Sequence, residues 1–355
     1  MKNKMTAAVL MVLCVLFSAA CAAEGIARSD LFAAGEGGYK SYRIPAMIVS
    51  ARGTVLAFAE ARKNGPADQG DIDIVVRRSF DGGATWDEKR IVYEDGAHTI
   101  GNPSPVVDRD TKEIILLFNK DNERVLVTRS VDDGATWAEP EDITKDVKPE
   151  GWKWYAMGPG HSIQLRSGRI LVPCDHTEKN VGRTHVIYSD DHGRTWRLGG
   201  TLPRETDEAT AVELVNGDVM INMRNNYMRG KRAVSVSKDG GMTWSKLIFQ
   251  KELVEPVCEG SILRYTRAGE QDANRLLFSN PASRLREKMT VKMSYDEGRT
   301  WPVARLVNEG LSGYSDLAVL PDMSVGLLFE NGEKAYHEKI TFVKFGLDWL
   351  TEGKD

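Results

Sequence analysis

The chain has 355 residues and a mass of 39.4 kDa, with 47 lysines and arginines against 51 aspartates and glutamates. The resulting net charge of −4 at pH 7 gives no electrostatic reason to expect nucleic acid as a partner. The length suits one large all-β domain or two ordinary domains, so other features must decide between them.

Residues 1–23 have the pattern of a secretory signal peptide. Lys2 and Lys4 precede an apolar run from Ala7 to Phe17, and small residues follow. The apolar run is too short to stay as a membrane-spanning helix. We therefore expect export to the periplasm or the medium, with Cys21 as a candidate for lipid attachment.

An eight-residue pattern occurs five times and organises the rest of the chain. The copies are SFDGGATW, SVDDGATW, SDDHGRTW, SKDGGMTW and SYDEGRTW, which start at Ser79, Ser130, Ser189, Ser237 and Ser294. An interval of roughly 50 residues is typical of stacked supersecondary units. Ser, Asp, Gly and Thr favour a turn that hydrogen-bonds its own backbone, while the closing Trp packs beneath it. The repeat predicts a single domain over residues 24–355, without a linker.

Short runs rich in β-branched residues surround each octet, three before it and one after its Trp. A sixth unit, ending in KITFVKF, has three such runs but no octet. The natural donor of its fourth strand is the segment near Ile26 to Phe32, which would close a ring without an open sheet edge. We predict an all-β fold: a six-bladed β-propeller of four-stranded antiparallel blades, with the N-terminal strand closing the last blade.

Antiparallel succession determines which ends of the strands share a face of the propeller. The start of the first strand and the end of the second lie together in each blade, and the octets lie at the opposite end. In the third unit the first strand is expected at HSIQL, which begins at His161. The aromatic residues Trp152, Trp154 and Tyr155 would then lie in the loop before it, either as a pocket wall or as packing between blades.

Four arginines are predicted to converge on the face opposite the octets. Arg43 begins the first strand of the first unit, and Arg62 ends its second strand. Arg224 ends the second strand of the fourth unit, and Arg286 begins the third strand of the fifth. Arg284 would share the strand face of Arg286 and is an alternative to it. Guanidinium groups bind a carboxylate through planar, bidentate hydrogen bonds, so the predicted ligand is anionic.

Asp68, Glu208, Tyr314 and Glu330 fall on the same predicted face. A glycosidase normally uses two carboxyl groups. An anionic nucleophile would be repelled by a substrate that carries a carboxylate at the reacting carbon. A neutral phenol that is deprotonated by a neighbouring carboxylate avoids this repulsion, and Tyr314 with Glu208 suits that requirement.

The remaining candidate groups receive structural interpretations. Asp71 and Asp73 compete with Asp68, but they lie inside a strand pattern, whereas Asp68 lies in a loop that contains Gly and Pro. Cys174 and Cys258 lack metal-ligand spacing, and the histidines form no HExxH-like motif. We therefore expect no catalytic metal and no cofactor.

With its octets and its YRIP sequence around Arg43, the chain resembles the exo-α-sialidases (neuraminidases) that carry Asp-box, or BNR, repeats. The resemblance extends from about Ile26 to the end of the chain. It implies hydrolysis of terminal sialic acid from sialylated glycoproteins, gangliosides and oligosaccharides, by a monomeric enzyme.

The resemblance implies a set of residues that bind the substrate carboxylate. Arg43, Arg224 and Arg286 would form an arginine triad around that carboxylate. Glu330 would hold Arg43 in place.

The resemblance also implies the catalytic residues. Asp68 would be the general acid and base, Tyr314 the nucleophile and Glu208 its base. Arg62 would face the hydroxyl side of the sugar ring, and Asn102 would line the acetamide region.

Three alternatives remain open from the sequence. A propeller that only binds sialoglycans would not need Tyr314, Glu208 and Asp68, all of which are present. A glycosidase with two catalytic carboxylates would leave the three arginines unexplained. A related enzyme that acts on another nonulosonic acid, or that transfers sialic acid to an acceptor, would use the same residues.

Overall fold

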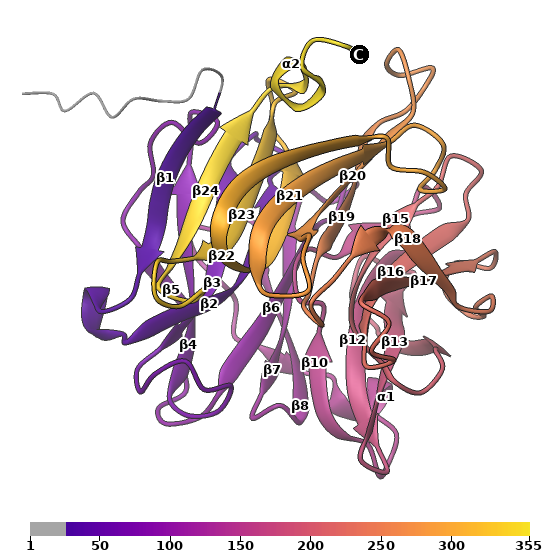
Figure 1. Cartoon of the computed structure of the whole chain (residues 1–355). Helices are drawn as coiled ribbons and strands as arrows, with labels where there is room; N and C mark the ends of the chain where they lie inside the picture. Colours follow the sequence, from indigo (N-terminus) through magenta and orange to yellow (C-terminus); the bar gives the residue numbers. More distant parts are fainter. Residues whose placement is uncertain (1–25) are drawn as a thin grey trace, which may run out of the picture.

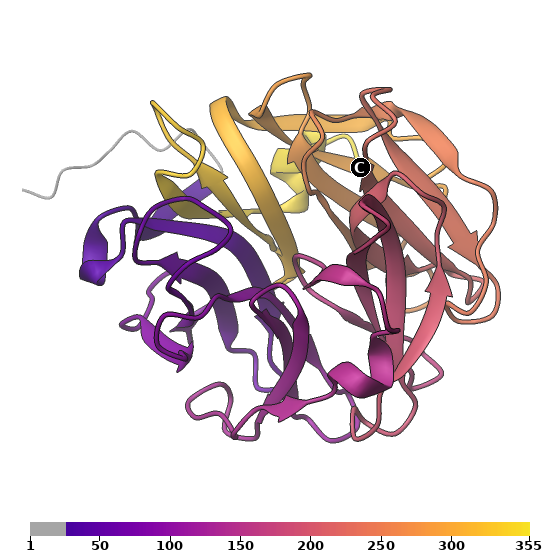
Figure 2. The same cartoon turned by 90° about the horizontal axis from the view of Figure 1, so that it is seen from below.

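The structure is a computed structural model, and it describes residues 26–355. The predicted signal peptide and Cys21 lie outside the described residues. The fold is all-β, with sheets arranged like the blades of a propeller around a common centre (Figures 1 and 2). The prediction of an all-β, propeller-like fold is confirmed. In the described part of the chain, no helix has the length and apolarity required to cross a membrane.

Four sheets are formed by strands that are consecutive in the sequence. The first contains β2 (Ser41–Val49), β3 (Val55–Arg62), β4 (Ile72–Ser79) and β5 (Arg90–Tyr93). The second contains β6 (Ile100–Val107), β7 (Ile114–Lys120), β8 (Arg124–Ser130) and β9 (Glu141–Asp142). The third contains β10 (Lys153–Met157), β11 (Ile163–Gln164), β12 (Ile170–Glu178), β13 (Val181–Ser189) and β14 (Arg197–Thr201). The fourth contains β15 (Thr206–Glu213), β16 (Val219–Asn225), β17 (Lys231–Ser237) and β18 (Ile248–Val254).

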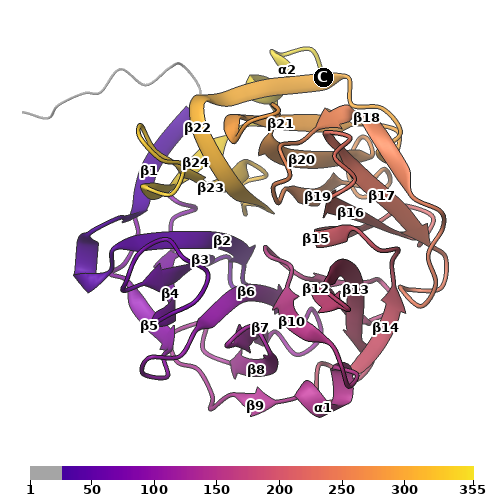
Figure 3. The same ribbon diagram turned by 60° about the horizontal axis from the view of Figure 1, so that its bottom comes forward.

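The fifth sheet has seven strands in the order β1-β24-β23-β22-β21-β20-β19. Its strands are β1 (Ile26–Ala33), β19 (Ser261–Thr266), β20 (Arg275–Pro281), β21 (Glu287–Ser294), β22 (Val303–Val319), β23 (Val325–Asn331) and β24 (Lys339–Phe345). The short helices η1 (Glu36–Gly38), α1 (Thr144–Val147) and α2 (Leu347–Thr351) lie in connections or at the C-terminus. In Figure 3 the labelled strands β2, β6, β15 and β22 face the centre.

Strand β22 joins two groups of strands into this one sheet. Its first half pairs with β21, from Met293↔Val303 to Glu287↔Leu311. Its second half pairs with β23, beginning at Ser312↔Asn331. The sequence patterns predicted two separate strands here, the last of one unit and the first of the next. Instead, the chain passes between them without leaving the extended conformation.

The first strand of the third unit differs from the one predicted from the sequence. The main inner strand is β10, which pairs with residues Cys174 to Thr177 of β12, and only Ile163 and Gln164 of the HSIQL segment form ladder pairs. The sequence Gly158-Pro159-Gly160 separates the two pieces. Proline cannot donate a ladder hydrogen bond, and both glycines have positive φ, so a continuous strand is interrupted there.

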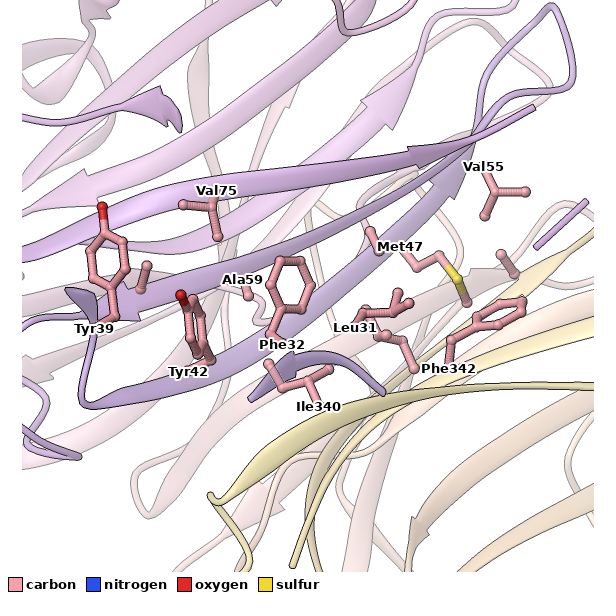
Figure 4. Close-up of a cluster of buried hydrophobic side chains, with 14 of the residues drawn as sticks. Leu31, Phe32, Tyr39, Tyr42, Met47, Val55, Ala59, Val75, Ile340 and Phe342 are labelled. Carbon is pink, nitrogen blue, oxygen red and sulfur yellow. The ribbon is translucent and has the colours of Figure 1, made fainter. Parts of the chain in front are cut away.

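The N-terminal strand β1 pairs antiparallel with β24, from Ile26↔Phe345 to Ala33↔Lys339. Its apolar side chains enter a buried cluster with those of β24, β2 and β3. Figure 4 shows Phe32 of β1 and Phe342 of β24 in this cluster. The first and last strands of the described chain therefore share one core.

Each octet forms a turn closed by its own side chains. In the first octet, Asp81 accepts hydrogen bonds from the Ser79 hydroxyl (2.8 Å) and the Thr85 amide (2.9 Å). The Gly83 amide donates to Ser79 Oγ at 2.7 Å. A side chain at Gly83, where φ is 91°, would collide with the ring of Phe342 in β24. This turn requires glycine because it lies against a neighbouring strand group.

The other four octets repeat this contact. Their corresponding glycines approach side chains of the preceding sheet in the same way, at Gly134 on Leu56, Gly193 on Ile115, Gly241 on Leu171 and Gly298 on Met220. The octets thus fix the spacing between neighbouring sheets, in addition to closing a local turn.

The aspartates of the octets should make the stability of the folded protein sensitive to acid. Although partial burial raises the pKa of Asp132, hydrogen bonds from Thr136 and Ser130 lower it to about 2. The folded state therefore takes up the proton less readily than the unfolded state, and this stabilisation is lost as the pH falls from about 4 toward 2. Asp132→Asn should reduce the free energy of unfolding at pH 7 by about 1 kcal/mol and weaken its dependence on pH in that window.

Urea unfolding at several pH values measures both effects. Asp146→Asn, which changes an exposed aspartate outside the octets, is the matched control and should leave stability nearly unchanged. Equal stability of the two variants at pH 7 would contradict the account of the octet.

Candidate active site

A pocket of about 300 Å³ lies where the inner strands of several sheets meet. Six of the nine residues predicted for the site line it, namely Arg62, Asp68, Asn102, Glu208, Arg224 and Tyr314. The other three, Arg43, Arg286 and Glu330, contact Tyr314 from behind or beside the pocket. The structure therefore brings all nine residues together from positions far apart in the sequence.

Three arginines surround Tyr314. The guanidinium carbon of Arg43 lies 5.1 Å from the centroid of the Tyr314 ring, and that of Arg286 lies 5.4 Å from it. Arg224 Nη1 donates a hydrogen bond of 2.9 Å to the Tyr314 hydroxyl. Three positive charges around one phenol make this part of the pocket a strong site for an anion.

The Tyr314 hydroxyl donates a hydrogen bond to Glu208 Oε1, while Glu208 Oε2 accepts one from Arg224 at 2.9 Å. Burial raises the pKa of Tyr314 well above its ordinary value, and the Glu208 charge adds to this increase. Arg224 and Arg43 oppose the increase without overcoming it. The resting phenol is therefore protonated, with a carboxylate already in position to accept its proton.

Glu330 connects Arg43 with the backbone of Tyr314. It accepts hydrogen bonds from Arg43 Nε at 3.1 Å, from the Ile44 amide at 3.0 Å and from the Tyr314 amide at 3.1 Å. The carboxylate is completely buried, so these partners replace its lost water. A side chain at Gly313 would collide with Glu330, which explains why glycine precedes Tyr314.

Asp68 reaches the pocket from the loop after β3. Its Oδ1 lies 3.1 Å from Arg43 Nη1 and 2.9 Å from Arg62 Nη1, yet 58% of its side chain is exposed. The two competing aspartates lie elsewhere, because Asp71 and Asp73 both pair with Lys63. Asp68 thus combines a fixed carboxylate oxygen with access to a ligand in the pocket.

Glu60 is a site residue that the sequence reasoning missed. Its carboxylate holds Arg62 through Arg62 Nε at 2.9 Å and also accepts the Asn102 amide at 2.7 Å. Asn119 donates to the Asn102 side-chain oxygen at 2.9 Å, and Asn102 itself has a positive φ of 54°. Side chains two positions apart lie on the same face of a strand, so the position of Glu60 relative to Arg62 could have indicated that both belong to the site.

Asp175 and Asp207 also line the pocket and were not predicted. Burial raises the pKa of Asp175 well above its ordinary value, and the nearby charges of Asp207 and Glu208 raise it further. Burial likewise raises the pKa of Asp207, against the opposing charge of Arg224. Asp175 lies toward the end of the second main strand of its sheet, as Arg62 and Arg224 do in theirs. Its place on the face of the pocket could therefore have been predicted in the same way.

Of the three aromatic residues predicted in a loop, Trp154 and Tyr155 lie in strand β10, and the three have different environments. Trp154 lines the pocket, whereas Trp152 stacks on the ring of His176 and Tyr155 is buried. Tyr336, which was not predicted, lies beside Arg43 and Arg286, at 5.4 and 4.8 Å from its ring centroid. Trp154 is therefore part of the pocket wall, whereas Trp152 and Tyr155 have packing roles.

Arg286 and Arg284 differ in their surroundings. The Arg286 guanidinium is packed between the rings of Tyr314 and Tyr336, and its Nη2 donates to the Val257 carbonyl at 3.4 Å. Arg284 is exposed and approaches Gly230. Of the two arginines, Arg286 is the one in contact with the central tyrosine.

One group of side chains could hold a metal ion within residues 26–355, namely Asp108, Asp110 and His192. Asp108 is buried, and its oxygens already accept hydrogen bonds from the Asp110 amide, from Gln164 and from His192. None of the three lines the pocket. The group is therefore adequately explained by its internal hydrogen bonds.

The loop beneath Arg286 and Tyr314 is supported by a buried ion pair. Arg232 Nη1 lies 3.0 Å from Glu255 Oε2, and both residues are almost fully inaccessible to solvent. Arg232 also donates to the Cys258 carbonyl, and Cys258 packs against Tyr314. The ion pair therefore holds the segment on which the tyrosine rests.

Removing one partner of this pair should be costly, because it leaves a buried charge without compensation. We expect Arg232→Met to lower the free energy of unfolding by about 3–5 kcal/mol, as measured by urea unfolding. Arg305→Met, which removes a surface pair with Glu352, is the control and should change it by less than about 1 kcal/mol. Similar losses in both variants would show that the buried pair has no special role.

Known proteins resemble this chain along most of its length. The model of a BNR repeat-like domain matches residues 53–328. A sialidase of Micromonospora viridifaciens is 37% identical, over 90% of this chain and 54% of that protein. An exo-alpha-sialidase of Arthroderma benhamiae is 31% identical, over 89% of this chain and 86% of that protein. The solved structure named Hadza microbial sialidase Hz136 is 32% identical, with a TM-score of 0.84 over 91% of this chain and 69% of that one.

The fold and these matches define a propeller-like protein with BNR repeats. The chain belongs to the sialidase family of glycoside hydrolases. It spans only about half the length of the Micromonospora relative but most of the Arthroderma one. The family resemblance found in the sequence is therefore confirmed.

Proposed function

We propose that this protein is a retaining exo-α-sialidase that releases terminal sialic acid from sialylated glycoproteins, gangliosides and oligosaccharides. The observation that carries the proposal is the environment of Tyr314. One buried phenol contacts three arginines and donates a hydrogen bond to a carboxylate, Glu208. A sugar with a carboxylate on its anomeric carbon would place that carboxylate on the arginines and its reacting carbon near the phenol.

In the bound substrate, Arg43, Arg224 and Arg286 would bind the carboxylate. Arginine suits this role because its planar fork matches both carboxylate oxygens. Glu330 would keep Arg43 oriented through the bonds that it already makes. The choice of Arg286 over Arg284 rests on its contact with Tyr314.

Other residues would position the rest of the sugar. Arg62, held by Glu60, would face the hydroxyl side of the ring. Asn102, held by Glu60 and Asn119, would line the acetamide region. Both side chains are fixed by buried partners before a ligand arrives, which reduces the entropy lost on binding.

In the first chemical step, Asp68 would protonate the leaving glycosidic oxygen. Tyr314 would attack the anomeric carbon while its proton passes to Glu208, along the hydrogen bond that joins them. The phenolate charge then develops only as the new bond forms, which limits repulsion by the substrate carboxylate. Sialidases with a Tyr nucleophile are a known exception to the rule of two catalytic carboxylates.

In the second step, Asp68, now deprotonated, would remove a proton from water as the water attacks the anomeric carbon. The bond to Tyr314 breaks, and Glu208 returns the proton to the phenolate oxygen. Two inversions at the same carbon give net retention. The exposed position of Asp68 supports its role in both steps, because the leaving group and the water must reach it.

We further infer that the fold is a closed ring of six blades. If β22 is counted in both of the groups that it joins, the strands form six units of four strands, with β11 as an additional short strand. The pairing of β1 with β24 supports closure by the N-terminal strand.

We propose that the protein is exported, with or without a lipid at Cys21, and that it acts as a monomer.

Tyr314→Phe tests the proposed nucleophile. Only a hydroxyl is removed, so the fold should persist, while kcat for a sialyl-lactose should fall by at least about 100-fold. The control is Tyr265→Phe, which removes a hydroxyl that donates to the Met323 carbonyl outside the pocket. Full turnover in Tyr314→Phe would refute the assignment.

The stereochemistry of the product tests the mechanism. Proton NMR of the wild-type protein with a sialyl-lactose should show α-sialic acid first, followed by slow mutarotation. Early β anomer would contradict retention. A dehydrated sugar or a new sialoside would indicate transfer instead of hydrolysis, and binding without release would favour a sialoglycan-binding propeller.

A further inference from the structure

A second pocket, of about 370 Å³, lies at the other end of the inner strands. Strand β15 connects the two pockets, because Glu208 near its start lines the first and residues Ala211 to Glu213 at its end line the second. Ile262 and Leu263 of β19 and Ile163 of β11 supply further apolar walls. The second pocket is therefore as large as the proposed catalytic one and is separated from it by the length of a strand.

Four arginines and two glutamates line this second pocket, namely Arg109, Arg166, Arg264, Arg267, Glu213 and Glu270. The two glutamates leave some hydrogen-bond donors of the guanidinium groups without an acceptor. In the part of the chain that the structure describes, Nη1 of Arg267 and Nε of Arg264 are buried without a hydrogen-bond partner. Burial, followed by the neighbouring charges of Arg264 and Arg166, lowers the pKa of Arg267. Both atoms are inaccessible to solvent, so a bound anion would interact with the guanidinium charges and would not bond to these two atoms.

The guanidinium groups are held in place by the fold. Glu297, a residue of the fifth octet, binds Arg264 through both carboxylate oxygens, at 2.8 and 2.5 Å. Glu213 lies 3.3 Å from Arg267 Nη2 and 3.6 Å from Arg166 Nε. Arginines fixed in this way need little ordering when they bind an oxyanion.

A buried histidine, His161, is also part of the pocket wall. Its Nδ1 lies 2.6 Å from Asp316 Oδ1, so the ring donates there and its orientation is fixed. The same ring lines the second pocket. The pocket thus combines cationic groups around its edge with apolar strand residues along its walls, which suits a ligand that has one anionic group and a less polar body.

We propose that this second pocket is a binding site for small organic anions, in which a carboxylate or phosphate group is held by Arg264 and Arg267. The two anionic groups share the oxyanion chemistry that a guanidinium recognises. The proposal is independent of the proposed sialidase activity, because none of its residues lines the first pocket.

Isothermal titration calorimetry with two probes, inorganic phosphate and glucuronic acid, tests the site in the full-length protein. The wild-type protein should bind at least one probe, and Arg267→Met should raise its Kd by about tenfold or more. Arg299→Met removes an exposed arginine of the fifth octet and should leave the Kd unchanged. Arg286→Met removes an arginine beside the first pocket, so it should weaken binding only if the probe occupies that pocket.

A second variant keeps the proposal testable if Arg267→Met fails to fold. Glu270 is exposed and lines the pocket, so Glu270→Gln removes a negative charge without breaking a buried contact. It should tighten binding by about two- to fivefold. A preference for phosphate would identify a phosphorylated ligand, and a preference for glucuronic acid a carboxylated one.

Two results would overturn the proposal. One is no heat of binding with either probe up to roughly 10 mM, a concentration that already corresponds to very weak affinity. The other is binding that is lost in Arg286→Met but retained in Arg267→Met and unaffected by Glu270→Gln, which would place the anion in the first pocket.

Discussion

Buried carboxylates that join the inner strands of different sheets are the interaction on which the rest of the structure depends. Asp316 of β22 accepts the amide of Met47 at 2.8 Å, the amide of His161 at 2.9 Å and the hydroxyl of Ser261 at 2.8 Å. These partners come from three separate parts of the molecule. Because an unpaired buried carboxylate is very unfavourable, the strands can meet at the centre only in the arrangement that supplies all the donors.

The same constraint builds the pocket. Glu330 ties β2 to β22 and simultaneously orients Arg43. Glu60 ties β3 to β6 and simultaneously orients Arg62. Each carboxylate has a structural partner in a backbone amide and a functional partner in an arginine. Stability and the geometry of the pocket therefore depend on the same side chains and cannot easily be altered separately.

Much of the fold and part of the site were predictable from the sequence, for different physical reasons. The octets and the β-branched runs reflect local turn and strand preferences, which are visible within ten residues. The convergence of Arg43, Arg62 and Arg224 follows from antiparallel order alone, because it depends on which end of a strand a residue occupies. These features require no knowledge of distant contacts.

The missed features depend on partners that lie far away in the sequence. Glu60 and Asp175 look like ordinary polar positions until the arginine, amide or carboxylate beside each is known. Strand β10 was missed because its aromatic residues Trp154 and Tyr155 were assigned to a loop, and only the HSIQL run was predicted as a strand. The continuity of β22 was hidden because its two halves were predicted as strands of different units, whereas pairing on both sides keeps the segment between them extended.

The continuity of β22 has a mechanical consequence for Tyr314. The strand changes neighbours between Leu311 and Ser312, only two residues before the tyrosine. The backbone of Tyr314 therefore lies between Leu311, which pairs with β21, and Ser315, which pairs with β23. A hinge motion at this residue would break hydrogen bonds with β21 or β23, so the backbone of Tyr314 is held more firmly than that of loop residues such as Asp68.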